Sequence, residues 1–143
     1  MSKDSTVLSM DIPGKPRSSR PAVLVVDSDN DFLNSLGILL ESENCEIIRA
    51  NGCDEAIEKI QGRQIDLLIT DFMLKSKSSI ELLILIRKSQ PDVPIVVVTE
   101  HSDIITLKDI KMFGGNQLLP KPLEVSLLRG MVRSYCNPLH ILN

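Results

Sequence analysis

Short apolar runs alternate along this chain with segments whose apolar residues recur at helical spacing. Runs rich in Val, Ile and Leu predict β-strands at residues 23–26, 46–49, 65–70, 95–99 and 117–119. Three of these runs are continuous, which is typical of strands in a parallel sheet that helices cover on both faces.

Five helical patterns follow these strands. The first spans residues 32–40, with Asp29 or Asn30 placed to cap it. The others are a short helix at residues 56–60 capped near 53–54 and stopped by Gly62, one from a serine to before Pro91, one from Ser102 to a pair of glycines, and one from Leu123 to about Tyr135.

Five strands alternating with five helices predict a doubly wound α/β domain with right-handed crossovers. In open sheets of this class, ligands bind beyond the carboxyl ends of the strands. Asp27 ends the first strand and Asp71 follows the third. Thr99 ends the fourth strand and Lys121 follows the fifth. Two carboxylates, a hydroxyl and an ammonium group therefore converge at one edge, and this set suits a cation and a phosphoryl group.

Composition and charge narrow the class of protein. The chain has 143 residues and a net charge of −3, so we expect one globular domain and no direct binding of nucleic acid. No apolar run approaches the roughly 20 residues of a membrane span, and the N-terminus lacks a secretory core. We therefore expect a cytoplasmic protein without a membrane partner. Three cysteines without C-x-x-C spacing disfavour a disulfide framework or a zinc site.

Four segments carry a family resemblance. The segments "VVDSD", "LLITDFMLK", "PIVVVTE" and "LLPKPL" each lie at the end of a predicted strand. Their order and spacing resemble the receiver domain of two-component response regulators over about residues 21–136. The resemblance implies a flavodoxin-like sheet of strand order 2-1-3-4-5 and a cis Lys121–Pro122 bond. It also implies a regulatory phosphoacceptor domain rather than an enzyme, with a sensor histidine kinase or phosphotransfer protein as partner.

The resemblance implies a role for each polar residue at the sheet edge. Asp71 would be the phosphoacceptor that attacks a phosphohistidine of the partner. Asp27, Asp71 and the backbone carbonyl of Met73 would bind Mg²⁺. Lys121 would place a positive charge on one phosphoryl oxygen, and the Thr99 hydroxyl would bond another.

The metal site departs from the family pattern. The family has two adjacent acids where this chain has Asp27 and Ser28. The site thereby loses a carboxylate ligand, so we expect weakened Mg²⁺ affinity. Asp29 would either replace that ligand, since alternate residues of an extended segment point the same way, or cap the first helix.

Further departures surround the acceptor. Lys75 stands where a proline is common and Ser79 where a glycine is common, which predicts a less constrained loop. Glu100 follows Thr99 where a small residue is typical, so its carboxylate would either repel the phosphoryl group or turn to solvent. Leu118 replaces the Tyr or Phe that reorients on activation in many members.

Two alternatives to a working receiver stay open. One is a pseudo-receiver, whose Asp71 is seldom phosphorylated and whose surface binds partners constitutively. The other rests on "DSDND", which resembles the D-x-D motif of haloacid-dehalogenase-type phosphatases, with Asp27 as nucleophile and Asp29 as general acid. The phosphatase alternative lacks a later acidic pair and leaves Asp71 unexplained. An EF-hand is excluded, because its required glycine and glutamate are Phe32 and Ile38.

The third predicted helix, "IELLILIRK", is apolar over more than one face. Ile80, Leu83 and Ile84 are expected to face the sheet. This leaves Leu82 or Leu85 partly exposed, either as a partner or dimer surface or packed against neighbouring helices.

We expect three segments, namely a disordered tail at residues 1–20, the receiver domain at 21–136 and a tail at 137–143. The last tail is too short for a DNA-binding helix-turn-helix, so output is expected by protein–protein binding. By resemblance, the fourth helix, fifth strand and fifth helix form a dimer or effector face, with Lys108, Lys111 and Arg129 on or near it.

Overall fold

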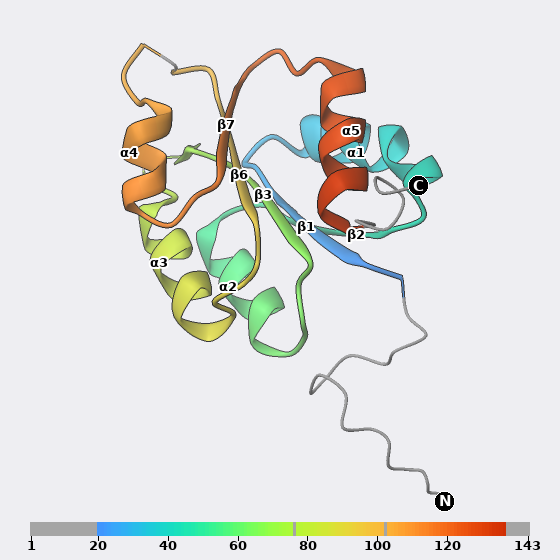
Figure 1. Ribbon diagram of the computed structural model, residues 1–143, viewed down its shortest axis with the longest axis horizontal. Coiled ribbons are helices and arrows are strands. Elements are labelled where there is room, and N and C mark those ends of the chain that lie inside the picture. The colour runs from blue at the N-terminus through green and yellow to red at the C-terminus, as the bar shows by residue number, and fades with distance from the viewer. Residues whose placement is uncertain (1–19, 76, 102, 137–143) are drawn as a thin grey trace, which may run out of the picture.

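A five-stranded parallel sheet lies at the centre of the molecule (Figure 1). The computed structural model describes residues 20–75, 77–101 and 103–136. In space the strands follow the order β2-β1-β3-β6-β7, which is the predicted order 2-1-3-4-5 because β4 and β5 form a separate antiparallel hairpin. The bounds are β1 Ala22–Val26, β2 Glu46–Ala50, β3 Leu67–Asp71, β4 Met73–Leu74, β5 Lys77–Ser78, β6 Ile95–Thr99 and β7 Gln117–Pro120.

Helices cover both faces of the sheet, as expected for a doubly wound domain. In Figure 1, α1 and α5 lie on one side of the sheet and α2, α3 and α4 on the other. The bounds are α1 Asn30–Leu39, the 3-10 helix η2 Glu41–Glu43, α2 Cys53–Gln61, α3 Ile80–Ser89, α4 Leu107–Met112 and α5 Val125–Cys136. The prediction of a doubly wound α/β fold with five α-helices is confirmed among the described residues.

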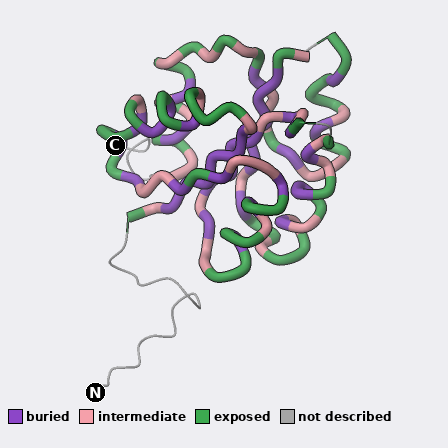
Figure 2. The backbone as a smooth tube through the Cα atoms, turned by 180° about the vertical axis from the view of Figure 1, so that it is seen from behind, coloured by how far each residue is buried: buried purple, intermediate pink, exposed green. Residues whose placement is uncertain are grey.

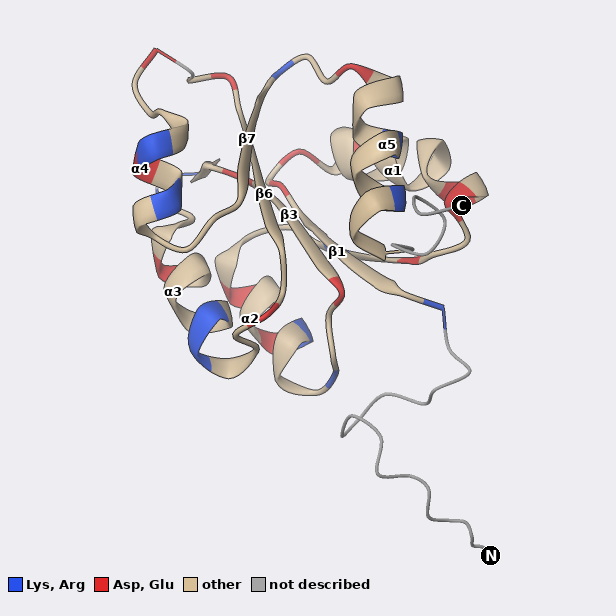
Figure 3. Cartoon of the chain, viewed as in Figure 1, with Lys and Arg blue, Asp and Glu red and all other residues tan. Residues whose placement is uncertain are grey.

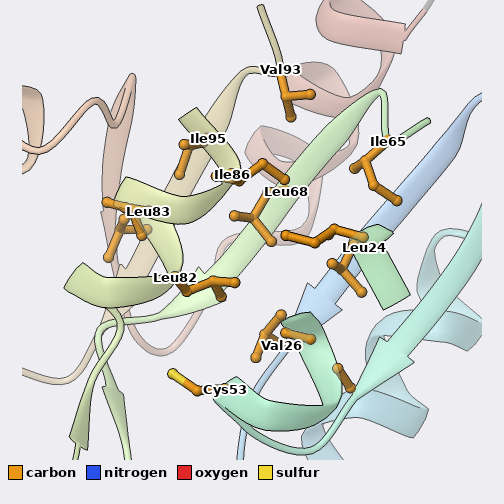
Figure 4. Packing of buried hydrophobic residues seen from close by; sticks show 14 of the residues in the cluster. Leu24, Val26, Cys53, Ile65, Leu68, Leu82, Leu83, Ile86, Val93 and Ile95 are labelled. Atoms are coloured by element: carbon orange, nitrogen blue, oxygen red, sulfur yellow. The ribbon is translucent and has the colours of Figure 1, made fainter. Parts of the chain in front are cut away.

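The central strands are buried on both faces, which is why their sequences are continuous apolar runs. Every residue of β1 is at most 1% exposed. Its side chains alternate, so that Val23 and Val25 pack in the cluster beneath α1 and α5. Leu24 and Val26 pack on the opposite side, near Leu82 of α3 (Figure 4). The buried segments of the tube in Figure 2 run through the middle of the molecule.

Helix α4 is shorter than the sequence pattern predicts. It begins at Leu107, whereas the expected start, Ser102, lies outside the described residues. The Thr106 hydroxyl accepts a hydrogen bond from the Asp109 amide, and the Asp109 carboxylate accepts one from the Thr106 amide. This reciprocal capping box makes Thr106 the N-cap, so the helix begins at Leu107 and does not extend further toward the N-terminus.

Helix α3 presents a different face to the sheet from the one predicted. Leu82, Leu83 and Ile86 are completely buried. Ile84, expected to face the sheet, is 44% exposed, and Leu85 is partly buried against the core. Because this helix is apolar on nearly all sides, its sequence did not indicate which side packs inward. The expectation that Ile84 faces the sheet was therefore wrong, and of the two residues expected to be partly exposed, Leu82 is buried whereas Leu85 is partly exposed.

A buried carboxylate joins α5 to the turn that follows α1. Arg133 of α5 donates two hydrogen bonds to Glu43 of η2, from Nε at 2.7 Å and from Nη2 at 3.0 Å. Arg129 also faces this turn, since its Nε donates to the carbonyl oxygen of Leu39 at 3.2 Å. Arg129 therefore points toward α1, and its expected place on the α4–β7–α5 face was wrong.

Strand β7 forms one edge of the sheet and ends in a proline. The amide of Lys121, just beyond it, donates to the carbonyl oxygen of Thr99 in β6 at 2.9 Å. Successive residues of a strand direct their amides to opposite sides. The backbone nitrogen of Pro120 therefore faces away from the sheet.

The two expected tails, apart from Arg20, lie outside the part of the chain that the structure describes. Among the helices described, none has the length and apolar character that crossing a membrane requires.

Candidate functional site

Three of the predicted residues meet at the carboxyl edge of the sheet. The Lys121 ammonium lies 2.7 Å from Oδ2 of Asp27 and 3.0 Å from Oδ2 of Asp71. The three side chains are 12%, 2% and 13% exposed, in that order. One cation therefore joins two largely buried carboxylates that come from different strands.

The backbone orients both carboxylates. Asp27 follows β1, and its Oδ1 accepts a hydrogen bond from the Asp29 amide at 2.8 Å. Asp71 ends β3, and its Oδ1 accepts one from the Met73 amide at 3.3 Å. Each carboxylate thus has one oxygen on a backbone amide and the other on Lys121, which fixes the direction of both groups.

Asp29 serves as the N-cap of α1. Its Oδ1 accepts hydrogen bonds from the amides of Asp31 at 2.9 Å and Phe32 at 3.3 Å. The side chain stands at the exposed start of the helix, where a carboxylate satisfies amides that have no partner within the helix. Of the two roles considered for Asp29, the geometry therefore corresponds to the cap.

Thr99 does not line the cavity at which the other predicted residues meet. The residue is completely buried, and its hydroxyl oxygen accepts a hydrogen bond from the His101 amide at 2.8 Å. Its neighbours Glu100 and His101 line a cavity of about 290 Å³ together with Asp27, Ser28, Asp29, Asp71, Met73, Lys75 and Lys121. The structure thus brings the acids and Lys121 to one cavity, whereas Thr99 is buried and does not line it.

The Lys121 side chain has a third neighbour, which the sequence analysis did not identify. Its ammonium lies 4.2 Å from the centre of the Phe32 ring, within the range of a cation–π interaction. The peptide bond between Lys121 and Pro122 is cis, as the resemblance implied. The only sequence signal for this contact was an aromatic residue three positions after Asp29.

The buried charges shift the pKa values of Asp71 and Lys121. Burial raises the pKa of Asp71 above its usual range, the Asp27 charge raises it further, and the hydrogen bond from Lys121 opposes both. Burial would lower the pKa of Lys121, but its hydrogen bonds and attraction to Asp27 and Asp71 outweigh burial and raise it. Lys121 therefore stays charged between the two acids.

Two of the departures from the family pattern lie after Asp71, Lys75 within the β4–β5 hairpin and Ser79 at the N-cap of α3. Lys75 has a φ of 64°, a backbone conformation that proline cannot adopt. Ser79 is completely buried, and its hydroxyl has no hydrogen-bond partner. Its amide donates to the carbonyl oxygen of Phe72 at 2.7 Å, which joins the hairpin to the end of β3.

The donor set was tested for its fit to a divalent cation. Within the described ranges, no group of three or more His, Cys, Asp and Glu side chains could hold a metal ion. Two carboxylates and a nearby backbone carbonyl at the rim of an open cavity do fit Mg²⁺, which keeps several waters and takes only one or two protein carboxylates. Ser28 lines the cavity as a neutral residue, so it adds no carboxylate to this set.

Comparison with known proteins identifies the class. The sequence model of the response regulator receiver domain family matches residues 23–133. A transcriptional regulatory protein of Escherichia coli (strain K12), GlrR, is 30% identical over 112 residues, which are 78% of this chain and 25% of that protein. The chain thus spans about a quarter of the length of this curated relative.

Solved structures agree. A two-component response regulator from Clostridium difficile is 28% identical, with a TM-score of 0.76 over 87% of this chain and 99% of that one. The response regulator TrrA from Thermotoga maritima, solved in complex with Mg(2+)-BeF, is 26% identical, with a TM-score of 0.71 over 80% of this chain and 98% of that one. The chain belongs to the response regulator receiver domain family of two-component signal transduction. The family that matches is the receiver domain and not the phosphatase of the alternative, which left Asp71 unexplained.

Proposed function

We propose that this domain accepts a phosphoryl group on Asp71 from a phosphohistidine of a sensor kinase or phosphotransfer protein. The observation that carries the proposal is the Lys121 ammonium between Asp27 and Asp71, at 2.7 and 3.0 Å. A carboxylate that attacks phosphorus must approach a negatively charged group, so it needs a fixed positive charge beside it. Lys121 supplies that charge in a largely buried setting, where it is screened least.

In the transfer, an Asp71 oxygen would form the new bond to phosphorus while the phosphorus–nitrogen bond of the donor breaks. The departing imidazole keeps the electron pair of the broken phosphorus–nitrogen bond. It then takes up a proton from solvent. The Lys121 ammonium would form an ion pair with a phosphoryl oxygen of the phosphorylated Asp71. The Thr99 hydroxyl, which accepts a hydrogen bond from the His101 amide, keeps its own hydrogen for a second phosphoryl oxygen.

Asp27, Asp71 and the Met73 carbonyl would hold Mg²⁺, whose charge when bound offsets the phosphoryl oxygens. Ser28 adds no charge to this set. We therefore expect the affinity for Mg²⁺ to lie below that of a site with two adjacent acids.

We propose that the protein acts in the cytoplasm and that the face it presents to a partner includes α4 and the loop before it. Ile104 and Met112 are 69% and 74% exposed, and Leu107 is 38% exposed. Lys108 and Lys111 are exposed on the same helix, which carries two basic bands in Figure 3. An apolar surface with two lysines suits a partner, or a second copy, that presents apolar and acidic side chains.

The test is incubation of the full chain with acetyl phosphate, with and without Mg²⁺, followed by intact-mass measurement. We expect a metal-dependent phosphoryl adduct in the wild type and none in Asp71→Asn. An adduct of equal size in Asp71→Asn would contradict the assignment of the acceptor.

A pseudo-receiver is the second candidate, favoured by Ser28 and by the exposed acid Glu100 at the cavity. It predicts no adduct at any Mg²⁺ concentration, together with partner binding that Asp71→Asn leaves unchanged.

A further inference from the structure

The aromatic ring beside Lys121 forms a third wall around its ammonium group. Phe32 lies in the first turn of α1 and packs against the buried cluster beneath α1 and α5. The ring centre is 4.2 Å from Nζ of Lys121, which is only 12% exposed. The two other neighbours of this ammonium are the carboxylates of Asp27 and Asp71. The ring is therefore its one apolar neighbour among the three contacts described.

A ring at this distance acts on the lysine in two ways. Its negative face attracts the ammonium, and the attraction is larger where the cation is shielded from water, as for Lys121, whose side chain is only 12% exposed. The ring also occupies space, which limits the conformations of a flexible four-carbon side chain. Both effects keep the ammonium at the point where the two carboxylates meet.

The first turn of α1 fixes the ring and one carboxylate together. The Asp29 carboxylate accepts a hydrogen bond from the Phe32 amide, and the Asp29 amide donates to Asp27 Oδ1 at 2.8 Å. The ring is therefore placed relative to Asp27 by a single helical turn. Asp29 thus orients this arrangement through its amide and through the same carboxylate that caps the helix.

We propose that Phe32 is a positioning residue, whose ring holds the Lys121 ammonium between Asp27 and Asp71 for phosphoryl transfer. This inference rests on the proposed function. Without the ring, Lys121 keeps its charge but samples more positions, so it meets the phosphoryl oxygen less often. The rate of transfer falls, whereas the core contact that Phe32 also makes is retained by another large apolar side chain.

The test compares Phe32→Leu, which removes the ring, with Phe32→Tyr, which keeps it. Phe113→Leu is the matched control, because Phe113 is also a partly buried ring but packs against the other core cluster. With acetyl phosphate and saturating Mg²⁺, we expect Phe32→Leu to lower the phosphorylation rate constant by about 3- to 30-fold. Phe32→Tyr and Phe113→Leu should stay within about twofold of the wild type. Equal rates in Phe32→Leu and the wild type would overturn the proposal.

A spectroscopic measurement separates positioning from a general loss of structure. The ring current of Phe32 should shift the Lys121 side-chain proton resonances upfield in the wild type and in Phe32→Tyr, but not in Phe32→Leu. Identical Lys121 shifts in wild type and Phe32→Leu would overturn the contact itself. If Phe32→Leu does not fold, Phe32→Met provides the ring-free variant in both measurements.

The two proposals fail in different ways. If the wild type accepts no phosphoryl group, the proposed function is wrong, and the NMR comparison still decides whether the ring holds Lys121. If the wild type is phosphorylated and Phe32→Leu matches it, only the positioning role is wrong.

Discussion

Arg133 holds the carboxylate of Glu43 by two hydrogen bonds, at 2.7 and 3.0 Å, although the two residues are 90 positions apart. The Glu43 side chain is only 3% exposed, and Arg133 is its nearer cationic partner. Arg129 lies farther away, at 3.9 Å from the same carboxylate. The pair connects the last helix to the turn after the first.

Arg133→Ala is expected to destabilise the fold more than Arg129→Ala, because it leaves a buried carboxylate with its weaker partner alone. Urea unfolding at neutral pH measures the difference in midpoint. Equal midpoints for the two variants would show that Glu43 does not depend on Arg133.

Lys121→Met should abolish phosphorylation and lower the free energy of unfolding by about 1–3 kcal/mol, because it leaves two largely buried carboxylates facing each other without a cation. Acetyl phosphate labelling measures the first effect and chemical denaturation the second. Lys108→Met, at an exposed position on α4, is the control and should change neither. Undiminished labelling of Lys121→Met would show that the lysine is dispensable.

Glu100→Gln should speed phosphorylation by acetyl phosphate about two- to fivefold, because the exposed carboxylate at the cavity repels a dianionic donor. The gain should shrink as salt screens the charge. Asp103→Asn removes an exposed acid nearby that does not line the cavity, and it should have little effect. A gain that persists unchanged at high salt would point to a steric cause.

Glu46→Gln should cost at most about 1 kcal/mol of stability at pH 7, because both partners of its pair with Arg63 are about a third exposed or more. The hydrogen bond from Arg63 lowers the pKa of Glu46, against a smaller opposing effect of burial. A carboxyl with a lowered folded-state pKa stabilises the protein above its unfolded pKa, and this contribution disappears as pH falls through the folded value. Unfolding midpoints of the two proteins should therefore differ at pH 7 and converge at pH 3. A constant difference would attribute the effect to packing.

The meeting of polar residues at the carboxyl ends of the strands was predictable, because it follows from the parallel strand arrangement alone. Asp27 and Asp71 each end a continuous apolar run, and parallel strands bring their carboxyl ends together. Lys121 met them as expected, at hydrogen-bond distance. The contact between Lys121 and Phe32 was not predictable, because the two residues are far apart in the sequence. It depends on the conformation of the Lys121 side chain in the folded protein.

Local sequence misled where a segment offered more than one solution. For α3, apolar residues on every side left the inward face undetermined, and Ile84, which was expected to face the sheet, is exposed. For α4, Thr106 and Asp109 formed a stronger start than the serine upstream. In both cases tertiary packing or a paired cap decided between patterns of similar strength.

The outward-facing nitrogen of Pro120 has a consequence for assembly. An edge strand normally offers a row of free amides on which a strand of another molecule can be added, and such addition leads to fibres as well as dimers. At the end of β7 that row is interrupted by a ring that cannot donate. Copies of this domain are therefore discouraged from joining sheet to sheet along β7, and any pairing on this side is left to the helices that flank it.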